Sequence, residues 1–541
     1  MGGWTLALWI VGFARLGFPS FWDPGDEAHY AQASREMLAS GDWLAPTYNG
    51  QPFFDKPPLF YWLQMIAFRA LGPTELAARL VPALSALLLF AATAWIARSL
   101  FRREVASLGV LILMLLPATF ALSSYAIIDM TFTALLVSGA SLVAISALHN
   151  RPRLQYVGYV VLALAVLAKG PVALVLTGLA GAVAFVVAPA ARPSLRRLHY
   201  VRGVALILAI SLPWFIYMWA RFGDAFIDGY ALRENVWLYT RALGDSTPGP
   251  TLSYARVLAI GLLPWTPVLL GRLVDIARGT PCDTGERWLW AWVVAVVGFF
   301  SGSSFKLDHY VYPAAPALCL LTANAWHEAR TAVSRRPHLG TLTGIAFAAG
   351  TLVAAGVALA RLVTALPLDL ERWMMVVPVA MSAAGGLLLL NLARRGWRPP
   401  AMPIGVAAAL LLGYTVMLVA LLPRFESAKP VRELGRIVAS TVSPSAVVGA
   451  YRMDRWNTSW RFYVDRPVEE LRTKDELGAF LDGSDRELCL MLDTDFNDLL
   501  AAGLPLRIVE QRRGLFTTSG RAITRGGSAG WRTFLVVARN D

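Results

Sequence analysis

Residues 79–99 read RLVPALSALLLFAATAWIARS, an apolar stretch of 21 residues with an arginine near each end. An α-helix rises about 1.5 Å per residue, so this stretch is long enough to cross a hydrocarbon core about 30 Å thick. No acidic residue interrupts it. The stretch therefore predicts a transmembrane helix.

The same pattern recurs along most of the chain. Apolar stretches lie near 4–20, 79–99, 105–122, 131–148, 156–169, 171–189, 203–220, 256–271, 288–303, 310–326, 341–363, 372–392 and 400–422. Hydrophobic residues make up 56% of the 541 residues and charged residues only 16%, against about 25% in ordinary soluble domains. We therefore predict a polytopic α-helical membrane protein with about 13 transmembrane helices, and the composition argues against a soluble enzyme.

The net charge is +13, and the basic residues are unevenly distributed among the connections between these stretches. Arginines gather in alternate connections, at 98–103, 151–153, 192–202, 272–287, 330–336 and 394–398. Because cytoplasmic loops of membrane proteins are enriched in Lys and Arg, this pattern places the N-terminus and the arginine-rich loops in the cytoplasm. The charge therefore reflects membrane topology and gives no support for nucleic-acid binding. Three cysteines are too few for a disulfide framework.

The composition changes after Pro423. Residues 424–541 carry 18 Lys and Arg against 16 Asp and Glu, and short apolar runs alternate there with helical patterns. This pattern predicts a small α/β domain that follows a transmembrane catalytic domain over residues 1–423. With 13 spans, the small domain lies on the outer face, where the two long loops 21–78 and 221–255 also lie.

Residues 21–30, FWDPGDEAHY, place several acidic side chains beside the end of a predicted span. Carboxylates near a low-dielectric boundary are costly unless they are paired with a cation, a metal or a substrate, which makes Asp26 a candidate catalytic group. Asp26 also stands where a helix starting at Ala28 would have its N-cap, so capping is the alternative. Tyr30 follows in the same motif.

Lys56 is held in a defined place by the two residues that follow it. Pro57 and Pro58 keep the local backbone extended. A lysine ammonium fixed at the outer membrane surface is a natural partner for a phosphate group. The alternative is a lysine that snorkels to the membrane interface.

Three further groups of polar residues belong to the same predicted face. Asp129 lies at the outer mouth of a helical hairpin without a basic neighbour in sequence, so it either binds a partner from elsewhere or caps the next helix. Arg233 and Arg241 in the second long loop suit phosphate oxygens, or they pair with nearby surface carboxylates. Lys306 and Tyr310 are candidates beside a span end, where the alternative is the interfacial aromatic belt.

These residues resemble a known family of membrane glycosyltransferases. The likeness rests on Asp26-Glu27-x-x-Tyr30, Arg35-Glu36-Met37, Gly41-Asp42-Trp43, Lys56-Pro57-Pro58-Leu59-x-Tyr61-Trp62, Lys169-Gly170-Pro171, and Lys306 with Tyr310, Pro313 and Pro316. As a set they resemble the bacterial lipid A aminoarabinose transferases, which are grouped with the protein O-mannosyltransferases in the glycosyltransferase type C fold. The likeness covers residues 1 to about 330 and is more specific to the superfamily than to one sugar.

The resemblance implies a sugar donor carried on a polyprenyl phosphate and an acceptor presented at the periplasmic face of the bacterial inner membrane. It implies Asp26 and Asp129 as catalytic carboxylates. It also implies that the lipid phosphate is bound by Lys56, Arg241, Tyr30, Lys306 and Tyr310.

Three positions depart from the family pattern. His29 stands where arginine is common, Asp55 where glutamate is common before Lys-Pro-Pro, and Glu234-Asn235 where a Glu-His pair is frequent. His29, Asp55 and Glu234 are the candidate ligands of a divalent metal in this chain, because carboxylate and imidazole groups are suitable donors. A metal stays open, and no cofactor is firmly predicted.

We therefore expect a glycosyltransferase that moves 4-amino-4-deoxy-L-arabinose from undecaprenyl phosphate to a lipid A phosphate. Such a modification of lipopolysaccharide confers resistance to cationic antimicrobial peptides such as polymyxin. The alternative is a related polyprenyl-phosphate-sugar transferase that acts on another glycan, lipid or protein. A transporter or flippase is disfavoured because the ionisable residues gather at one face and no internal repeat is recognised. Membrane lipid is the remaining expected partner, and nucleic acid is not.

Overall fold

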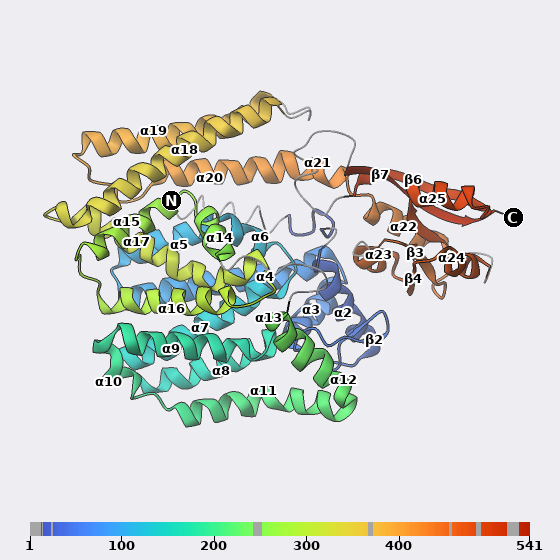
Figure 1. Cartoon of the computed structure of the whole chain (residues 1–541), viewed down its shortest axis with the longest axis horizontal. Helices are drawn as coiled ribbons and strands as arrows, with labels where there is room; N and C mark the ends of the chain where they lie inside the picture. The colour runs from blue at the N-terminus through green and yellow to red at the C-terminus, as the bar shows by residue number, and fades with distance from the viewer. Residues whose placement is uncertain are drawn as a thin grey trace.

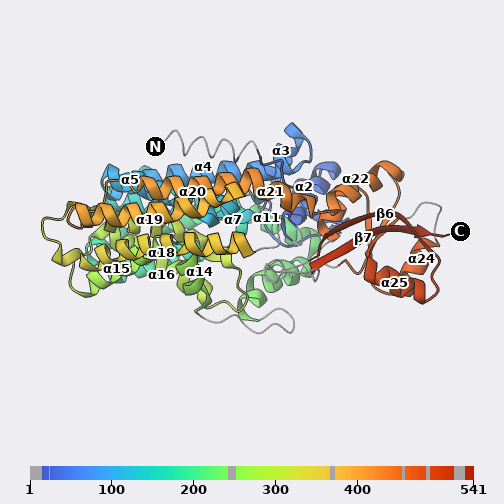
Figure 2. The ribbon, with the colours of Figure 1, turned by 90° about the horizontal axis from the view of Figure 1, so that it is seen from above.

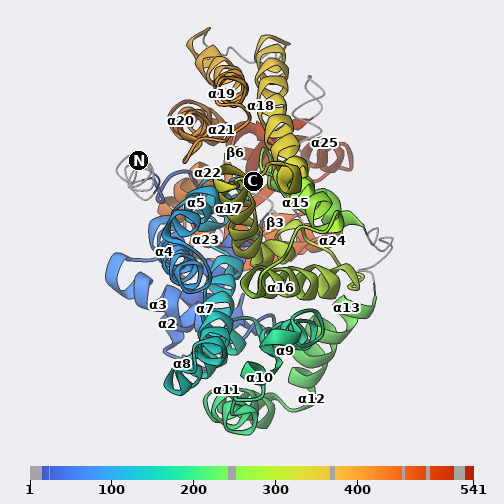
Figure 3. The ribbon, with the colours of Figure 1, turned by 90° about the vertical axis from the view of Figure 1, so that its left-hand side faces the viewer.

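The computed structural model describes residues 12, 15–22, 25–241, 252–365, 372–453, 457–482, 488–516 and 530–540. A long body of helices makes up most of the molecule, and the C-terminal residues form a smaller domain at one end of it (Figure 1). The helices of the body run roughly along its long axis, as the view from above in Figure 2 and the view along the axis in Figure 3 show.

The body consists mainly of apolar helices. They are α4 (Glu75–Leu100), α5 (Arg103–Leu115), α6 (Pro117–Ser123), α7 (Ile128–Leu148), α8 (Pro152–Lys169), α9 (Val172–Val187), α11 (Tyr200–Phe222), α14 (Ser253–Gly261), α15 (Thr266–Ala277), α16 (Thr284–Ser301), α17 (Ala315–Thr331), α18 (Leu339–Ala365), α19 (Val376–Arg394) and α20 (Ile404–Val416). Among the described residues, six helices are long and apolar enough to cross a membrane, or nine if each bent pair is one span. A polytopic helical fold is thus confirmed. The count of 13 stays a prediction, and its first stretch, 4–20, falls mainly outside the described residues.

Three of the predicted spans are bent rather than straight. α5 and α6 meet at 66°, α14 and α15 at 114°, and α9 meets the segment Pro189–Leu195 at 114°. A proline stands at each break, namely Pro117, Pro264 and Pro189. Because proline lacks a backbone N–H and clashes with the preceding turn, it ends the first helix of each pair.

The first long loop folds into two helices and a hairpin. α2 (Glu27–Ser40) starts directly after Asp26, and α3 (Leu59–Leu71) follows the Lys56-Pro57-Pro58 motif. Between them lies the hairpin of β1 (Thr47–Tyr48) and β2 (Gln51–Pro52). Its turn residues Asn49 and Gly50 have φ angles of 54° and 71°, as the favoured Asn-Gly hairpin turn requires.

The second long loop continues from α11 as short helical turns. These are α12 (Asp224–Phe226), η2 (Ile227–Trp237) and α13 (Leu238–Thr240). η2 is a π-helix of 11 residues. Such wide turns are uncommon in proteins and are frequent at functional sites. Before α17, the chain also forms the 3₁₀ segment η3 (Asp308–Ala314).

The C-terminal residues form an α/β domain. Its elements are α22 (Val431–Thr441), β3 (Val448–Tyr451), α23 (Asn457–Val464), β4 (Val468–Leu471), α24 (Lys474–Leu481), β5 (Cys489–Leu492), α25 (Asp493–Ala501), β6 (Leu506–Leu515) and β7 (Trp531–Arg539). The sheet has the order β4-β3-β5-β7-β6, with β3 parallel to both neighbours and β7 antiparallel to both of its own. Four strands fall on the predicted apolar runs, whereas β4 and α23 were not predicted.

The C-terminal domain shares a core with the first long loop. Phe21 and Ala28 of the loop belong to one buried apolar cluster with Val431, Trp460 and Tyr463 of the domain. Burial of apolar surface contributes about 25 cal/mol per Å², so a shared cluster holds the two parts together. The first loop is therefore packed between the helical body and the C-terminal domain.

Candidate functional site

The residues proposed from the sequence gather around one cavity of about 600 Å³. Its charged and hydrogen-bonding lining residues are Asp26, His29, Tyr30, Asp55, Lys56, Asp129, Lys169, Arg233, Glu234, His309 and Tyr310. Nine of the eleven residues singled out from the sequence are among them, and Arg241 and Lys306 are not. The fold thus brings both long loops and the mouths of several helices to a single site.

Asp26 faces this cavity from the start of α2. It occupies the N-cap position, but its side chain makes no capping hydrogen bond, and the residue is exposed. The capping alternative is therefore wrong for the Asp26 side chain. Tyr30, one turn further along α2, is buried. Burial, assisted by the charge of Asp55, raises the pKa of Tyr30 well above 10, so the hydroxyl is a hydrogen-bond donor at neutral pH.

The Lys56 ammonium lies between two carboxylates. Its Nζ is 2.6 Å from Asp55 Oδ1 and 3.2 Å from Glu234 Oε2. Burial lowers the pKa of Lys56, but the two carboxylates outweigh this effect and raise the pKa well above its ordinary value. Lys56 therefore carries its charge inside the cavity, whereas a snorkelling lysine would place its ammonium at the membrane interface.

The two carboxylates that hold Lys56 differ in their protonation. Burial raises the pKa of Asp55, but the nearby Lys56 ammonium outweighs it, so that the pKa lies below its ordinary value. Burial raises the pKa of Glu234 to about 6 against the opposing effect of Lys56, and the hydrogen-bonded Asp55 adds to the rise. The pair is thus one ionised carboxylate beside one that titrates close to neutral pH.

Asp129 lies in the first turn of α7 and has a nitrogen-bearing side chain near each oxygen. Lys169 Nζ, at the end of α8, is 2.5 Å from Oδ1, and His309 Nε2 is 3.5 Å from Oδ2. Lys169 Nζ also lies 4.5 Å from the centre of the Tyr310 ring. Asp129 thus binds partners from elsewhere in the fold, which was one of the two alternatives open from the sequence.

Lys169 and His309 are site residues that sequence reasoning did not single out. Lys169 entered the sequence analysis only as part of the motif Lys169-Gly170-Pro171. The signal that could have identified it is a basic residue on the same predicted face as Asp129. Gly170 has a φ of +88°, and a Cβ there would lie 2.3 Å from the Tyr230 hydroxyl. Only glycine fits this turn without strain, and the turn directs the end of α8 toward the cavity.

The remaining predicted cations lie outside the cavity lining. Arg241 is exposed and lies with its guanidinium 5.3 Å from the centre of the Trp237 ring. The Lys306 ammonium donates a hydrogen bond to the Ser303 carbonyl. Arg233, the other candidate of the second loop, does line the cavity. Phosphate binding by Arg241 and Lys306 stays a prediction.

The candidate metal ligands do not form a ligand cluster. Among the described residues, no group of three His, Cys, Asp or Glu side chains is arranged to hold a metal ion. The Lys56 ammonium occupies the space between Asp55 and Glu234. The His29 ring packs beside Tyr48 and Phe53, with centroid distances of 4.8 and 6.4 Å. This arrangement suits a buried ammonium, so no chemical step is assigned to a metal.

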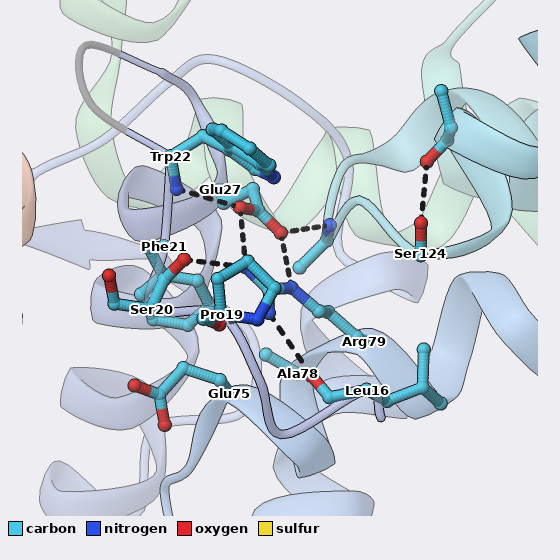
Figure 4. A network of polar contacts seen from close by, with 12 residues as sticks. Leu16, Pro19, Ser20, Phe21, Trp22, Glu27, Glu75, Ala78, Arg79 and Ser124 are labelled. Atoms are coloured by element: carbon cyan, nitrogen blue, oxygen red, sulfur yellow. Dashed lines mark hydrogen bonds and ion pairs between the residues drawn. The ribbon is translucent and has the colours of Figure 1, made fainter. Parts of the chain in front are cut away.

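A buried ion pair fixes the backbone close to Asp26 and Asp129. Glu27 and Arg79 are 2.8 Å apart and almost fully buried (Figure 4). Glu27 also accepts the N–H groups of Trp22, at 3.0 Å, and Ala126, at 2.8 Å. Arg79 donates in addition to the carbonyls of Leu16, Pro19 and Ser20. The pair therefore ties α2, α4 and the segment before α7 together.

Comparisons with known proteins show that this chain is similar to sugar transferases. The family model described as dolichyl-phosphate-mannose-protein mannosyltransferase matches residues 55–217. The undecaprenyl phosphate-alpha-4-amino-4-deoxy-L-arabinose arabinosyl transferase of Edwardsiella ictaluri is 29% identical over 462 residues, 80% of this chain and 79% of that protein. The transferase of the same name numbered 1 from Sodalis glossinidius is 32% identical over 315 residues, 56% of this chain and 54% of that protein. The latter match thus spans about half of the relative's length.

The fold has a close counterpart among solved structures. The crystal structure of ArnT from Cupriavidus metallidurans bound to undecaprenyl phosphate superposes with a TM-score of 0.76 and 23% sequence identity. The match covers 98% of this chain and 96% of that one. The apo crystal structure of the same protein gives the same TM-score, with 22% identity. The similarity therefore includes the helical body and the C-terminal domain.

Proposed function

We propose that this chain is a polytopic membrane glycosyltransferase related to the aminoarabinose transferases, and that it transfers 4-amino-4-deoxy-L-arabinose from undecaprenyl phosphate to a lipid A phosphate. The observation that carries the proposal is the cavity in which the Lys56 ammonium shares a wall with Asp26 and Asp129. The names of the Edwardsiella and Sodalis relatives support this sugar and this lipid carrier.

Lys56 has the chemistry needed for the leaving group. When the bond between the anomeric carbon and the donor phosphate breaks, negative charge grows on the phosphate oxygens. A fixed cation stabilises this charge more strongly in the transition state than in the bound donor, and such preferential stabilisation is what accelerates a reaction. The two carboxylates beside Lys56 keep it charged despite its burial.

Asp26 and Asp129 have different roles in this scheme. Asp129 forms an ion pair with Lys169 and lies 3.5 Å from His309, so it orients groups in the cavity wall. Asp26 is exposed to the cavity. With a lipid A phosphate as acceptor, which is already ionised, Asp26 positions the acceptor or stabilises positive charge on the sugar. Direct displacement at the anomeric carbon inverts its configuration.

The site belongs at the periplasmic face in this proposal. The long loops and the C-terminal domain lie at the same end of the helical body (Figure 1). The arginine-rich connections follow the other ends of the spans, and the positive-inside rule places those in the cytoplasm. The donor and the acceptor then meet at the outer surface of the inner membrane, where lipid A is modified and polymyxin resistance arises.

A second candidate function is favoured by the family match over residues 55–217. A transferase of the same fold could use the same cavity to move a sugar from a polyprenyl phosphate to a protein or another glycan. The contacts to the donor phosphate would be the same, and only the acceptor would differ. The acceptor therefore decides between the two functions.

The test is a transfer assay with the full chain in phospholipid nanodiscs. We expect undecaprenyl-phosphate-linked aminoarabinose and lipid A to give lipid A with the added sugar, measured by mass spectrometry. Asp26→Asn and Lys56→Ala should each lower the rate at least 100-fold, with Asp308→Asn, which lies outside the cavity lining, as a matched control. Rates within about threefold of the native chain, or about 0.65 kcal/mol, would contradict both roles. Transfer to protein but not to lipid A would favour the second function.

A further inference from the structure

The C-terminal domain holds the chain on the N-terminal side of Asp26. Phe21 donates its backbone N–H to the Tyr463 hydroxyl at 2.7 Å. Ser20 donates its N–H to both carboxylate oxygens of Glu426 at 3.0 Å, and Lys429 donates to the Ser20 carbonyl at 2.7 Å. Three side chains from beyond residue 423 therefore bind the backbone of two consecutive residues of the first loop.

The same domain also holds the chain on the C-terminal side of Asp26. Thr458 Oγ1, on α23, lies 3.4 Å from His29 Nε2. Arg35 of α2 donates to the backbone carbonyls of Phe462, at 2.9 Å, and Arg461, at 3.2 Å. α23 thus contacts α2 at its first turn and again two turns later.

The Tyr463 hydroxyl joins three parts of the molecule. It accepts the N–H of Phe21 and donates to Glu75 Oε1 at 3.0 Å. Glu75 lies in the first turn of α4, one turn before Arg79. Tyr463 and Glu75 are both buried, where a polar contact that is lost leaves an unsatisfied group that costs about 1–3 kcal/mol. One hydroxyl therefore links the first loop, α4 and α23.

We propose that Tyr463 and Thr458 of α23 are positioning residues for Asp26 and His29, so that the C-terminal domain completes the catalytic site without lining its cavity. The inference rests on the proposed function. Among the described residues, none after 423 lines the cavity, so the domain acts through the backbone and the His29 side chain that it contacts.

The position of Asp26 depends on contacts made by its neighbours in the chain. Its side chain makes no capping hydrogen bond, so its place depends on the backbone on either side. On one side the backbone of Ser20 and Phe21 is bound by Glu426 and Tyr463. On the other side the side chains of Glu27 and His29 are held by Arg79 and Thr458. A misplacement of about 1 Å in a catalytic group can lower the rate about 100-fold. Loss of these contacts should therefore affect the chemical step before it affects binding of the donor.

The experiment compares Tyr463→Phe and Thr458→Val with the native chain in nanodiscs. Tyr463→Phe removes only the hydroxyl and keeps the ring. Tyr451→Phe is the matched control, because Tyr451 is a buried tyrosine of the same domain that packs in a different apolar cluster. The measurements are kcat, the Kd of undecaprenyl-phosphate-linked aminoarabinose, the number of donor sites per chain, and hydrogen exchange of the backbone amides by mass spectrometry.

We expect Tyr463→Phe to lower kcat per donor site at least 10-fold while the Kd of the donor changes less than twofold. Exchange of amides between residues 20 and 30 should rise at least 10-fold, and exchange in the sheet of the C-terminal domain should stay the same. Thr458→Val should lower kcat about threefold to tenfold in the same manner. Tyr451→Phe should change none of these values.

The proposal is overturned if kcat per donor site stays within twofold in both variants. It is also overturned if exchange rises throughout the C-terminal domain together with the donor Kd, because that pattern means a structural role alone. If Tyr463→Phe does not fold, Thr458→Val decides by the same criteria. If the native chain transfers no sugar, the proposed function fails, and the exchange measurement still shows whether α23 holds residues 20–30.

Discussion

Lys56 and Glu234 lie 178 residues apart in the chain, and their side chains form an ion pair of 3.2 Å inside the cavity. Asp55 holds the same ammonium at 2.6 Å. A donor phosphate that binds Lys56 must therefore compete with two carboxylates. Asp55 stays ionised, so the strength of this competition depends on the protonation of Glu234.

The affinity for the donor should rise as the pH falls. Burial raises the pKa of Glu234 to about 6. Above pH 6 Glu234 is ionised and competes with the phosphate for Lys56, and below pH 6 it is neutral and competes weakly. The phosphodiester of the donor stays ionised over this range. We expect the donor Kd to fall about tenfold between pH 8 and pH 5, since one pKa unit corresponds to about 1.4 kcal/mol.

The Glu234→Gln variant provides the control for this pH dependence. Glutamine has nearly the shape of a protonated glutamate, so the variant should bind the donor at pH 8 about as tightly as the native chain does at pH 5. The pH dependence should disappear between these values. A pH dependence that persists in Glu234→Gln would assign the titration to another group of the cavity, such as His29 or His309.

The ion pair of Lys169 and Asp129 should be important for stability. The two side chains are only 11% and 9% exposed, and removing one partner of a buried pair costs about 3–5 kcal/mol. We therefore expect Lys169→Met to lower the unfolding temperature in detergent clearly. The double variant Lys169→Met with Asp129→Asn should recover much of this loss, because no buried charge is left unpaired. Additive losses would show that the pair is not coupled.

Arg233 should contribute to the binding of the donor phosphate. Arg233 lines the cavity, whereas the guanidinium of Arg241 lies over the Trp237 ring. We expect Arg233→Gln to weaken donor binding about tenfold at low salt and less at high salt, since exposed charges are screened. Arg241→Gln is the matched comparison in the same loop. A loss confined to Arg241→Gln would contradict this assignment and would support the role that the family resemblance implies for Arg241.

Replacement of Gly170 by alanine should already impair the site. Its φ of +88° disfavours any residue with a Cβ, and a methyl group would clash with the Tyr230 hydroxyl. Gly170→Ala should therefore lower the transfer rate at least tenfold by displacing Lys169 from Asp129. Tyr230→Phe added to Gly170→Ala should restore part of the rate, because it removes the atom in the way. If the double variant is no better than Gly170→Ala, backbone strain alone explains the loss.

The candidate site was predicted well where each residue carries a local signal. Asp26 follows a turn at the start of a helix, and Lys56 precedes two prolines. Lys169 and His309 were not singled out because they acquire their meaning from Asp129, to which only the packing of α7, α8 and η3 brings them. The metal hypothesis for His29, Asp55 and Glu234 overlooked Lys56, whose ammonium lies between the two carboxylates.

The C-terminal domain shows the same limit. Its strands β3, β5, β6 and β7 follow apolar runs, which are local features. Helix α23 was not predicted. It has only eight residues, and its polar residues Thr458, Ser459 and Arg461 are buried together with the apolar ones, so polarity in the sequence does not mark an exposed face. An element that contacts the loop of Asp26 was thus missed from the sequence.

The sequence by itself determined that the chain is a polytopic helical membrane protein with an α/β domain at its end and acidic and basic residues gathered at one face. Hydropathy over about 20 residues and the distribution of arginines are sufficient for that, because membrane insertion responds to them locally. Only the tertiary structure decided that Glu234 pairs with Lys56, that Lys169 and His309 lie against Asp129, and that Tyr463 binds the loop of Asp26. Those contacts join segments as far as 442 residues apart, and they depend on how the helices pack, which no local pattern contains.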